Sequence, residues 1–498
     1  METDKLILSN KSALTAKYGK QLTEVERAVK EMIAADKKRG IVSKFIYLDG
    51  ATALKKMKVP AVKSANSATQ VKATIDALSK KYTPDYLLLI GSVDVIPHCE
   101  LKNLIPDDDD EIVPSDLPYA CEKKYSTKIS DFLSPTRVIG RLPDITGGSD
   151  AKYLAGLIRN AIKAQTKNLN EYKSVFALSA KVWKGSTTQS LINIVGDAKT
   201  MKLIPPKGKH TRAQLQRKTH FINCHGAQVD SKFYGQQGES YPQALHAREL
   251  DGNISFGCVV AAECCYGAEL FDPEYTDGDL NVSNTYMREG ALGFLGSTTV
   301  AYGPAEGQGE ADLLTQYFIR NVHKGFSLGR SLLDARLRYV EKALPRIEPT
   351  ELKTIAQFIL LGDPSVHLVK PSVATEAAAS KHFTEGTTRL MRKDRRQGLK
   401  IRGENVERYA QKPHEQRPKA LAKSIQSVLK EHGINNAAVA SFNYSKTISG
   451  KAKSSKGASC HLFLQREESQ KQLIPQTTLL VIKDVGGEVV EVKRLERR

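Results

Sequence analysis

Long hydrophobic runs are missing from this sequence of 498 residues. No stretch approaches the ~18 consecutive apolar residues that a membrane span needs. The first residues, METDKLILSNKSA, lack the charged start, the long apolar segment and the small-residue cleavage site of a signal peptide. We therefore expect no membrane association and a cytoplasmic location.

Cysteine is scarce and does not follow a disulfide pattern. The chain has seven cysteines, an odd number, and they are scattered except for the adjacent pair Cys264 and Cys265. Secreted disulfide-rich domains have an even number at close spacing, so the pattern favours a reducing compartment.

Tryptophan is almost absent, since the chain has one. Proteins that bind single-stranded nucleic acid interleave aromatic with basic side chains, and no such segment is found here. A nucleic-acid-binding protein in the strict sense is therefore unsupported.

Positive charge is abundant, with a formal net charge of +19. Residues 373–498 contain 25 Lys and Arg against 13 Asp and Glu. A basic segment of this kind can bind nucleic acid, an anionic membrane surface or an acidic protein, and a solvated lysine-rich surface without a partner fits equally well.

The first 370 residues alternate short apolar runs with amphipathic stretches, which predicts an α/β fold with a largely parallel sheet. The expected strands are 6–8, 41–48, 86–90, 137–139, 174–178, 220–223, 256–261 and 291–295. The expected helices are 22–38, 68–80, 150–167, 311–323 and 327–344. The acidic run 107–110 is expected to form a solvated turn, with a weak calcium site as the alternative.

Beyond residue 371 the composition changes. Residues 373–418 are polar and include the basic run LMRKDRRQGLK, which indicates an exposed linker. Residues 419–498 are predicted to form a small basic α+β module, with a helix at 420–432 and a hairpin of 478–483 with 488–495.

Two short segments end apolar runs in reactive side chains. FINCHGAQ (221–228) presents His225 followed by glycine, and CVVAAECCYGAEL (258–270) presents Cys265 before a glycine turn. Functional groups gather at the carboxyl ends of strands in α/β sheets, so both segments should meet at one edge. A thiol needs a nearby base to become a thiolate, and histidine suits neutral pH.

These segments resemble the caspase-like superfamily of cysteine peptidases (clan CD), whose signature is a run ending in His-Gly followed by one ending in a reactive cysteine. The chain is most similar to the gingipain-type family, in one order over residues 5–370. The further segments that carry the likeness are PDYLLLIGSVDVIP (84–97), PSDLPYA (114–120), RVIGRLP (137–143), ALGFLGSTT (291–299) and ILLGDPSV (359–366).

The resemblance implies a caspase-haemoglobinase fold with two subdomains, 1–172 and 173–372, and the catalytic pair in the second. It implies that His225 is the general base and Cys265 the nucleophile. The backbone N–H groups of Gly226 and Cys265 would form the oxyanion hole. Because residues 178–181 lack the acid that some family members carry there, it implies a dyad, with a carbonyl group or a water orienting His225.

Two alternatives concern the neighbouring cysteines. Cys264 is the competing nucleophile, although the family pattern places it at a small packing position. Cys224 is expected on the opposite face of its strand from His225. These thiols and His225 also have the atom types of zinc ligands, but directly adjacent pairs suit a zinc site poorly. We expect neither a metal nor a cofactor.

Substrate preference is predicted from Glu263, which lies two residues before Cys265 and so shares its face of an extended strand. In related peptidases with basic specificity an acid at this place lines the S1 pocket. Glu263 would then pair with Arg or Lys at P1 of a polypeptide substrate. Asp272 and Asp277 are the alternatives for this role.

The sequence therefore predicts a cytoplasmic cysteine endopeptidase in regulated proteolysis, with an upstream activator or a processing protease acting on the basic linker as possible partners. The alternative is a catalytically silent caspase-like scaffold whose basic module binds nucleic acid or an acidic protein.

Overall fold

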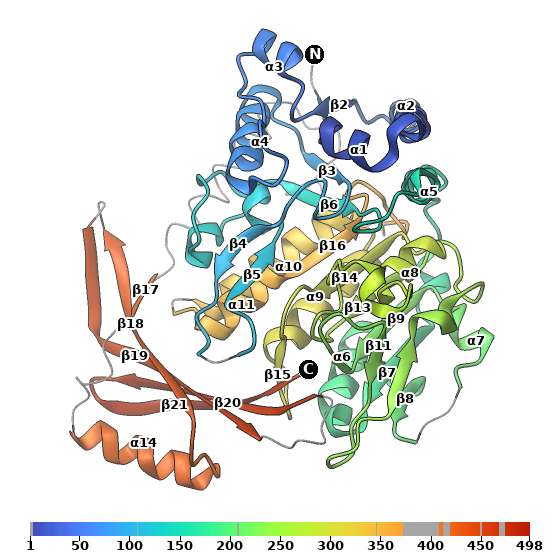
Figure 1. Cartoon of the computed structure of the whole chain (residues 1–498). Helices are drawn as coiled ribbons and strands as arrows, with labels where there is room; N and C mark the ends of the chain where they lie inside the picture. The colour runs from blue at the N-terminus through green and yellow to red at the C-terminus, as the bar shows by residue number, and fades with distance from the viewer. Residues whose placement is uncertain are drawn as a thin grey trace.

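The computed structural model of the chain describes residues 3–106, 108–206, 209–344, 346–371, 408–411, 419–448, 451–467 and 474–498. A large sheet with helices on both faces forms the body, and a second sheet carries the C-terminal part beside it (Figure 1). The predicted class is confirmed: a mostly parallel α/β fold with an added C-terminal α+β module.

The large sheet has ten strands in two blocks of opposite direction. In spatial order they are β2 (Ser43–Tyr47), β1 (Lys5–Ser9), β3 (Tyr86–Ile90), β6 (Val138–Leu142), β16 (Phe358–Gly362), β14 (Gly293–Ser297), β13 (Val259–Ala262), β9 (Thr219–Asn223), β7 (Val175–Ala180) and β8 (Met201–Ile204). Among these neighbours only β14 and β16 pair antiparallel. The strands of the two blocks therefore end at opposite edges of the sheet.

Side chains along the central strands alternate between two apolar clusters. In β13, Val259 and Ala261 belong to one cluster, and Val260 and Ala262 to the other, as the two-residue period of a strand requires. The helices that pack in the cluster of Val260 include α1 (Lys11–Tyr18), α2 (Leu22–Lys38), α4 (Ala68–Tyr82), α5 (Ala151–Ile162) and α8 (Val282–Arg288). Those in the cluster of Val259 include α6 (Lys184–Val195), α9 (Glu310–His323), α10 (Leu328–Ala343) and α11 (Pro349–Gln357).

A buried ion pair joins two of the segments that carry the family likeness. Arg141 in β6 is fully buried, and its Nε and Nη2 donate to the two carboxylate oxygens of Asp116 at 2.9 and 2.6 Å. Bidentate pairing of this kind fixes the geometry of both groups. It ties the loop after β5 (Ile112–Ser115) to the sheet.

The C-terminal module is an antiparallel sheet with one helix against it. Its order is β15 (Tyr302–Pro304), β21 (Glu488–Arg497), β20 (Gln476–Val485), β19 (Lys451–Glu467), β18 (Ala438–Ile448) and β17 (Arg408–Gln411). Helix α14 (Lys419–Glu431) buries Leu421 and Ile425 against Leu480 and Ile482. The first of these strands, β15, comes from the part of the chain that forms the body, so its pairing with β21 joins the module to the body by backbone hydrogen bonds. The chain terminus lies beside β15 in Figure 1.

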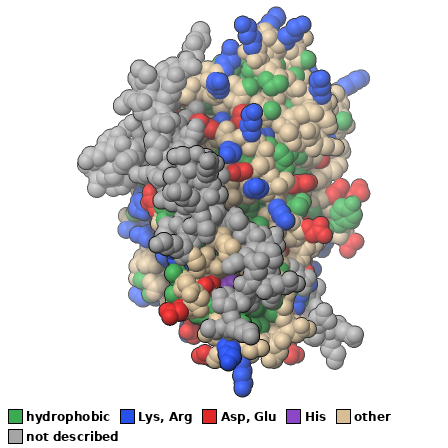
Figure 2. Space-filling view, turned by 90° about the vertical axis from the view of Figure 1, so that its left-hand side faces the viewer, with side chains coloured by type: hydrophobic (Ala, Val, Ile, Leu, Met, Phe, Trp, Pro, Cys, Tyr) green, Lys and Arg blue, Asp and Glu red, His purple; other side chains and the backbone are tan. Residues whose placement is uncertain are grey.

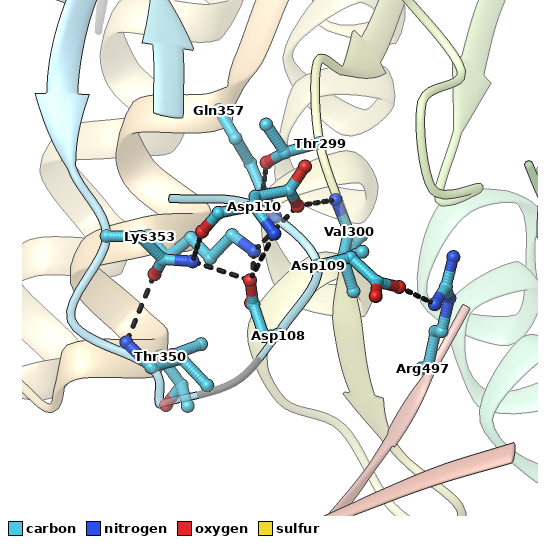
Figure 3. Close-up of polar contacts among 12 residues, drawn as sticks. Asp108, Asp109, Asp110, Thr299, Val300, Thr350, Lys353, Gln357 and Arg497 are labelled. Atoms are coloured by element: carbon cyan, nitrogen blue, oxygen red, sulfur yellow. Dashed lines mark hydrogen bonds and ion pairs between the residues drawn. The ribbon is translucent and has the colours of Figure 1, made fainter. Parts of the chain in front are cut away.

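The acidic run is not the solvated turn that we expected. Asp108 is buried, and its carboxylate pairs with the Nζ of Lys353 on α11. Asp110 accepts a hydrogen bond from the backbone N–H of Val300 at 2.8 Å, and Asp109 pairs with Arg497 of β21 (Figure 3). The run instead joins the body to the C-terminal module, because it meets cations from both.

Other predicted features have different outcomes. The linker 373–418, including its basic run, lies outside the described residues apart from β17. The boundaries at 172 and 372 stay predictions, and the ten-stranded sheet runs through both halves. No helix in the described ranges is long and apolar enough to cross a membrane. On the face drawn in Figure 2, Lys and Arg lie mostly singly over its upper part.

His220 of β9 makes stability depend on pH. Burial lowers the pKa of its imidazole from 6.5 to about 4. Its stabilising contribution is therefore complete above pH 6.5 and is lost as the pH falls toward 4, because the unfolded chain binds the proton first. Relative to His220→Gln, the wild type should lose about 2 kcal/mol of unfolding free energy between pH 7 and pH 5. Urea unfolding of both chains at the two pH values checks this, and a constant difference contradicts it.

Candidate active site

His225 and Cys265 follow the ends of two neighbouring strands. β9 ends at Asn223 and β13 at Ala262, and the two strands pair in parallel, so both end at one edge of the sheet. Each reactive residue lies a few positions beyond its strand. The chain thus brings together the two segments that the sequence singled out.

The ring of His225 is held by an amide. Its Nε2 lies 2.7 Å from the Oε1 of Gln236, and since an amide oxygen only accepts, Nε2 carries the proton. Nδ1 is then the basic nitrogen, and it is buried without a hydrogen-bond partner among the described residues. The rings of Trp183 and Tyr241 pack at centroid distances of 4.3 and 5.1 Å. Burial lowers the pKa of His225 to about 3, so the ring is neutral here.

The thiol of Cys265 is fully buried. Its Sγ accepts a hydrogen bond from the N–H of Ala301 at 3.2 Å and lies 3.5 Å from the carbonyl oxygen of the same residue. Burial raises the pKa of Cys265, and the nearby charge of Arg497 opposes this. In this arrangement the thiol is protonated and no described hydrogen bond joins it to His225.

Gly226 packs directly on the backbone of Cys265. A Cβ added to this glycine would lie 1.8 Å from the carbonyl oxygen of Cys265, which is far inside any allowed contact. Only a residue without a side chain permits this approach. The close packing keeps the His-Gly turn beside the cysteine.

The two cysteines that neighbour the catalytic candidates in sequence, Cys224 and Cys264, face away from Cys265. Cys264 and Cys224 both belong to the apolar cluster on the opposite face of the sheet, whereas Cys265 belongs to the cluster that contains α9. Burial raises the pKa of Cys264 well above its ordinary value. The assignment of Cys265 rather than Cys264 as the nucleophile stays a prediction, and these positions favour it.

Two buried acids lie on the same face as Cys265. Glu263 accepts a hydrogen bond from the Oγ1 of Thr315 at 3.0 Å, and Asp312 lies on the same helix, α9. Both carboxyl groups are fully buried. Burial, and next the charge of Asp312, raise the pKa of Glu263 well above its ordinary value. The neutral form of Glu263 is therefore favoured, and Asp312 forms an ion pair with Arg498.

Arg498 fills the space beside these acids. Its Nη2 lies 3.0 and 3.2 Å from the two oxygens of Asp312, and 3.4 Å from the Oγ of Ser186. The guanidinium packs over the ring of Trp183 at 4.4 Å, and the whole residue is buried. Of the two acids, Asp312 is therefore already paired with an arginine.

Asp272 and Asp277 occupy a different place. Asp272 caps the short helix η7 (Pro273–Thr276) by accepting from the N–H of Glu274, and Asp277 follows its end in a left-handed conformation. No interaction described for them reaches Cys265 or Arg498. They remain untested as S1 residues, with less support than Glu263.

A cluster of three acids elsewhere has the spacing of metal ligands: Glu310, Glu348 and Glu351. The Nζ of Lys493 lies 3.0 Å from Glu348 and 3.5 Å from Glu351, so a lysine occupies the cluster.

Sequence reasoning missed three residues of the site: Gln236, Asp312 and Trp183. Gln236 stands in a glutamine- and glycine-rich loop with no pattern of its own. Asp312 lies in the first turn of a predicted helix, where acids are common as capping groups. Trp183 was the one weak signal, because it is the only tryptophan of the chain.

Comparison with known proteins bears on the nature of this site. The family model described as Peptidase family C25 matches residues 24–369, well over half of the chain. The chain belongs to peptidase family C25. The resemblance to gingipain-type peptidases of clan CD is thereby confirmed, and the protein is a cysteine peptidase at the level of its family.

Two solved structures are also similar to this C25 chain. One, described as "Structure of Protease", aligns over 99% of this chain and 97% of its own, with 11% identity and a TM-score of 0.49. The Saccharomyces cerevisiae separase–securin complex aligns over 47% of this chain and 14% of its own, with 15% identity and a TM-score of 0.29. No curated protein matches. The assignment to C25 therefore rests on the family match.

Gly226→Ala tests the close packing in this C25 site. The added methyl group cannot fit against Cys265, so the His-Gly turn must move and peptidase activity should fall by about 100-fold or more. Gly156→Ala is the matched control, because a Cβ there meets nothing within 4 Å and the helix α5 gains a better helix former. Peptide hydrolysis by the two variants checks this. Equal activity in both would show that the turn does not need this contact.

Proposed function

We propose that this chain is a cysteine endopeptidase that cleaves after Arg or Lys, with Cys265 and His225 as its catalytic pair. The observation that carries the specificity is the buried ion pair of Asp312 with the guanidinium of Arg498, on the same face of the sheet as Glu263 and Cys265. A charged acid in a buried pocket selects a cationic side chain, because an apolar one would leave it unpaired.

The chemistry follows from the arrangement. The Nδ1 of His225 takes the proton of the thiol, and Sγ of Cys265 attacks the carbonyl carbon of the substrate. The N–H groups of Cys265 and Gly226 stabilise the oxyanion. His225 then gives its proton to the leaving amine, and water hydrolyses the thioester to release the acid and the free thiol. Gln236 is a positioning residue that keeps Nδ1 unprotonated, in the role for which the sequence suggested a carbonyl group.

The burial of both groups indicates that the described arrangement is closed. A neutral thiol with a raised pKa and an imidazole with a pKa of about 3 do not form an ion pair. Access of water and substrate to the pair would raise the pKa of His225 and lower that of Cys265, because burial is the first cause of both shifts. A cytoplasmic location remains a prediction from the cysteine pattern.

Replacement of each cysteine tests the nucleophile. Fluorogenic peptides with P1 Arg, Lys, Asp or Leu should be cleaved only when P1 is Arg or Lys. Cys265→Ala should abolish cleavage, with a loss of at least about 10⁴-fold, whereas Cys264→Ala should retain it because that thiol faces the opposite cluster. Activity lost only in Cys264→Ala would move the nucleophile by one residue. The silent scaffold is favoured if no form cleaves any peptide under reducing conditions, including a form in which Arg498, which fills the space beside Asp312, is replaced by Ala.

Asp312→Asn tests the pocket. Loss of the charge should lower the ratio of kcat/KM for P1 Arg over P1 Leu by about 10- to 100-fold. The ratio within one variant is the useful quantity, since any change in access to the site cancels. Asp272→Asn is the matched control and should leave the ratio unchanged. If Asp272→Asn changes the ratio and Asp312→Asn does not, the pocket is misassigned.

A further inference from the structure

Strand β21 lies where an extended peptide would bind. It pairs antiparallel with β15, with Arg497 opposite Tyr302 and Leu495 opposite Pro304. β15 follows Ala301, the residue whose N–H contacts the Sγ of Cys265. An edge strand beside a nucleophile is the surface on which a peptide can add as a further strand, and here the chain fills it itself.

The backbone of Arg498 continues this pairing into the site. Its N–H donates to the carbonyl oxygen of Ala301 at 2.9 Å. Its own carbonyl oxygen lies 3.4 Å from the N–H of Cys265, the proposed oxyanion donor. An acyl group whose oxygen is at this donor has its carbonyl carbon next to the nucleophile. Arg498 thus has the position of a P1 residue.

The side chain of Arg498 agrees with its backbone. The guanidinium reaches Asp312 and also donates to the carbonyl oxygen of Pro304 at 3.0 Å. A Cβ on Gly303 would lie 2.3 Å from Nη2, so the absence of a side chain there makes room for the group. The carbonyl group of Arg498 lies at the proposed oxyanion donor and its guanidinium lies at Asp312. These are the two positions that the backbone and the side chain of a basic P1 residue would occupy.

Two basic residues of β21, and Arg498 directly after it, each meet acids of the body. Arg498 pairs with Asp312, Arg497 with Asp109, and Lys493 with the glutamate cluster around Glu348. The contacts are spread along the strand and bring opposite charges together at each point. Such complementarity fixes the register of a docked strand.

We propose that β21 is a built-in, substrate-like inhibitor of this peptidase, with Arg498 as its P1 residue, and that the enzyme becomes active when this strand leaves β15. The proposal rests on the proposed function, because it assigns Asp312 to S1 and Cys265 to catalysis. It agrees with the burial of Cys265, because the carbonyl oxygen of Arg498 lies at the N–H of that residue. It also gives part of the basic C-terminal segment an acidic partner within the same chain.

The test compares Arg498→Ala and Arg498→Glu with the wild type. Arg494→Ala is the matched control, since Arg494 is on the same strand but half-exposed, with a contact of 3.9 Å to Glu496. Three quantities are measured under reducing conditions: the rate at which iodoacetamide modifies Cys265, located by peptide mapping; the emission of the only tryptophan, Trp183; and kcat/KM for a P1 Arg peptide.

In both Arg498 variants, iodoacetamide should modify Cys265 about tenfold faster or more than in the wild type, and kcat/KM for the peptide should rise by a similar factor. The larger effect is expected for Arg498→Glu, because Asp312 repels the charge of the glutamate. Trp183 emission should shift to longer wavelength as water replaces the guanidinium. Arg494→Ala should behave as the wild type. Circular dichroism and the melting temperature confirm that each variant is folded.

The outcomes separate the two proposals. If both Arg498 variants keep the wild-type modification rate, emission and cleavage rate, β21 is not an inhibitor, although the peptidase assignment stands. If modification and emission change but no form cleaves any peptide, the strand does cover Cys265 and the proposed endopeptidase activity is wrong. A decrease in kcat/KM in both variants together with faster modification would also overturn the inhibitory role.

Discussion

Strands β9 and β13 run side by side in the same direction and stop at one edge of the sheet. Because parallel strands bring their carboxyl ends together, the residues that follow them share one small volume. The alternation of side chains then decides which of these residues face α9. Glu263 accepts a hydrogen bond from Thr315 of α9 and Cys265 shares a cluster with that helix, whereas Cys264 faces the other way. The positions of the other residues of the site depend on this parallel pairing of β9 with β13.

Much of the body was predictable because its elements have strong periodic patterns. The helix at 22–38 was found with the predicted bounds, and β20 and β21 form the predicted hairpin, with Gly486 and Gly487 between them. Of the ten strands of the large sheet, β8 and β16 were missed. β8 is a short, partly exposed edge strand with a weak apolar pattern, and β16 reads equally well as the apolar end of the helix before it. Its antiparallel pairing with β14 depends on tertiary structure alone.

The candidate site was predictable only in its chemical part. Reactive residues and their strand ends are local features, so His225 and Cys265 could be found in the sequence. Gln236 and Asp312 act through long-range contacts and have no local pattern. The acidic run was misread for the same reason, because Asp108 meets a lysine on α11 that is distant in sequence. Composition alone does not show which charged residues pair with each other inside the fold. Residues that do so can therefore be mistaken for a binding site for an external partner.

The direct link between β15 and β21 has a consequence for competition. A ligand attached to the same chain acts at an effective concentration that is typically in the millimolar range. A free peptide at micromolar concentration therefore competes poorly with β21 for pairing with β15, even if its P1 side chain binds well. Entry of a substrate would therefore be controlled less by its own affinity than by any force that pulls the small module away from the body. The free energy needed to detach the C-terminal module, rather than the affinity of the S1 site, would decide when a substrate can bind.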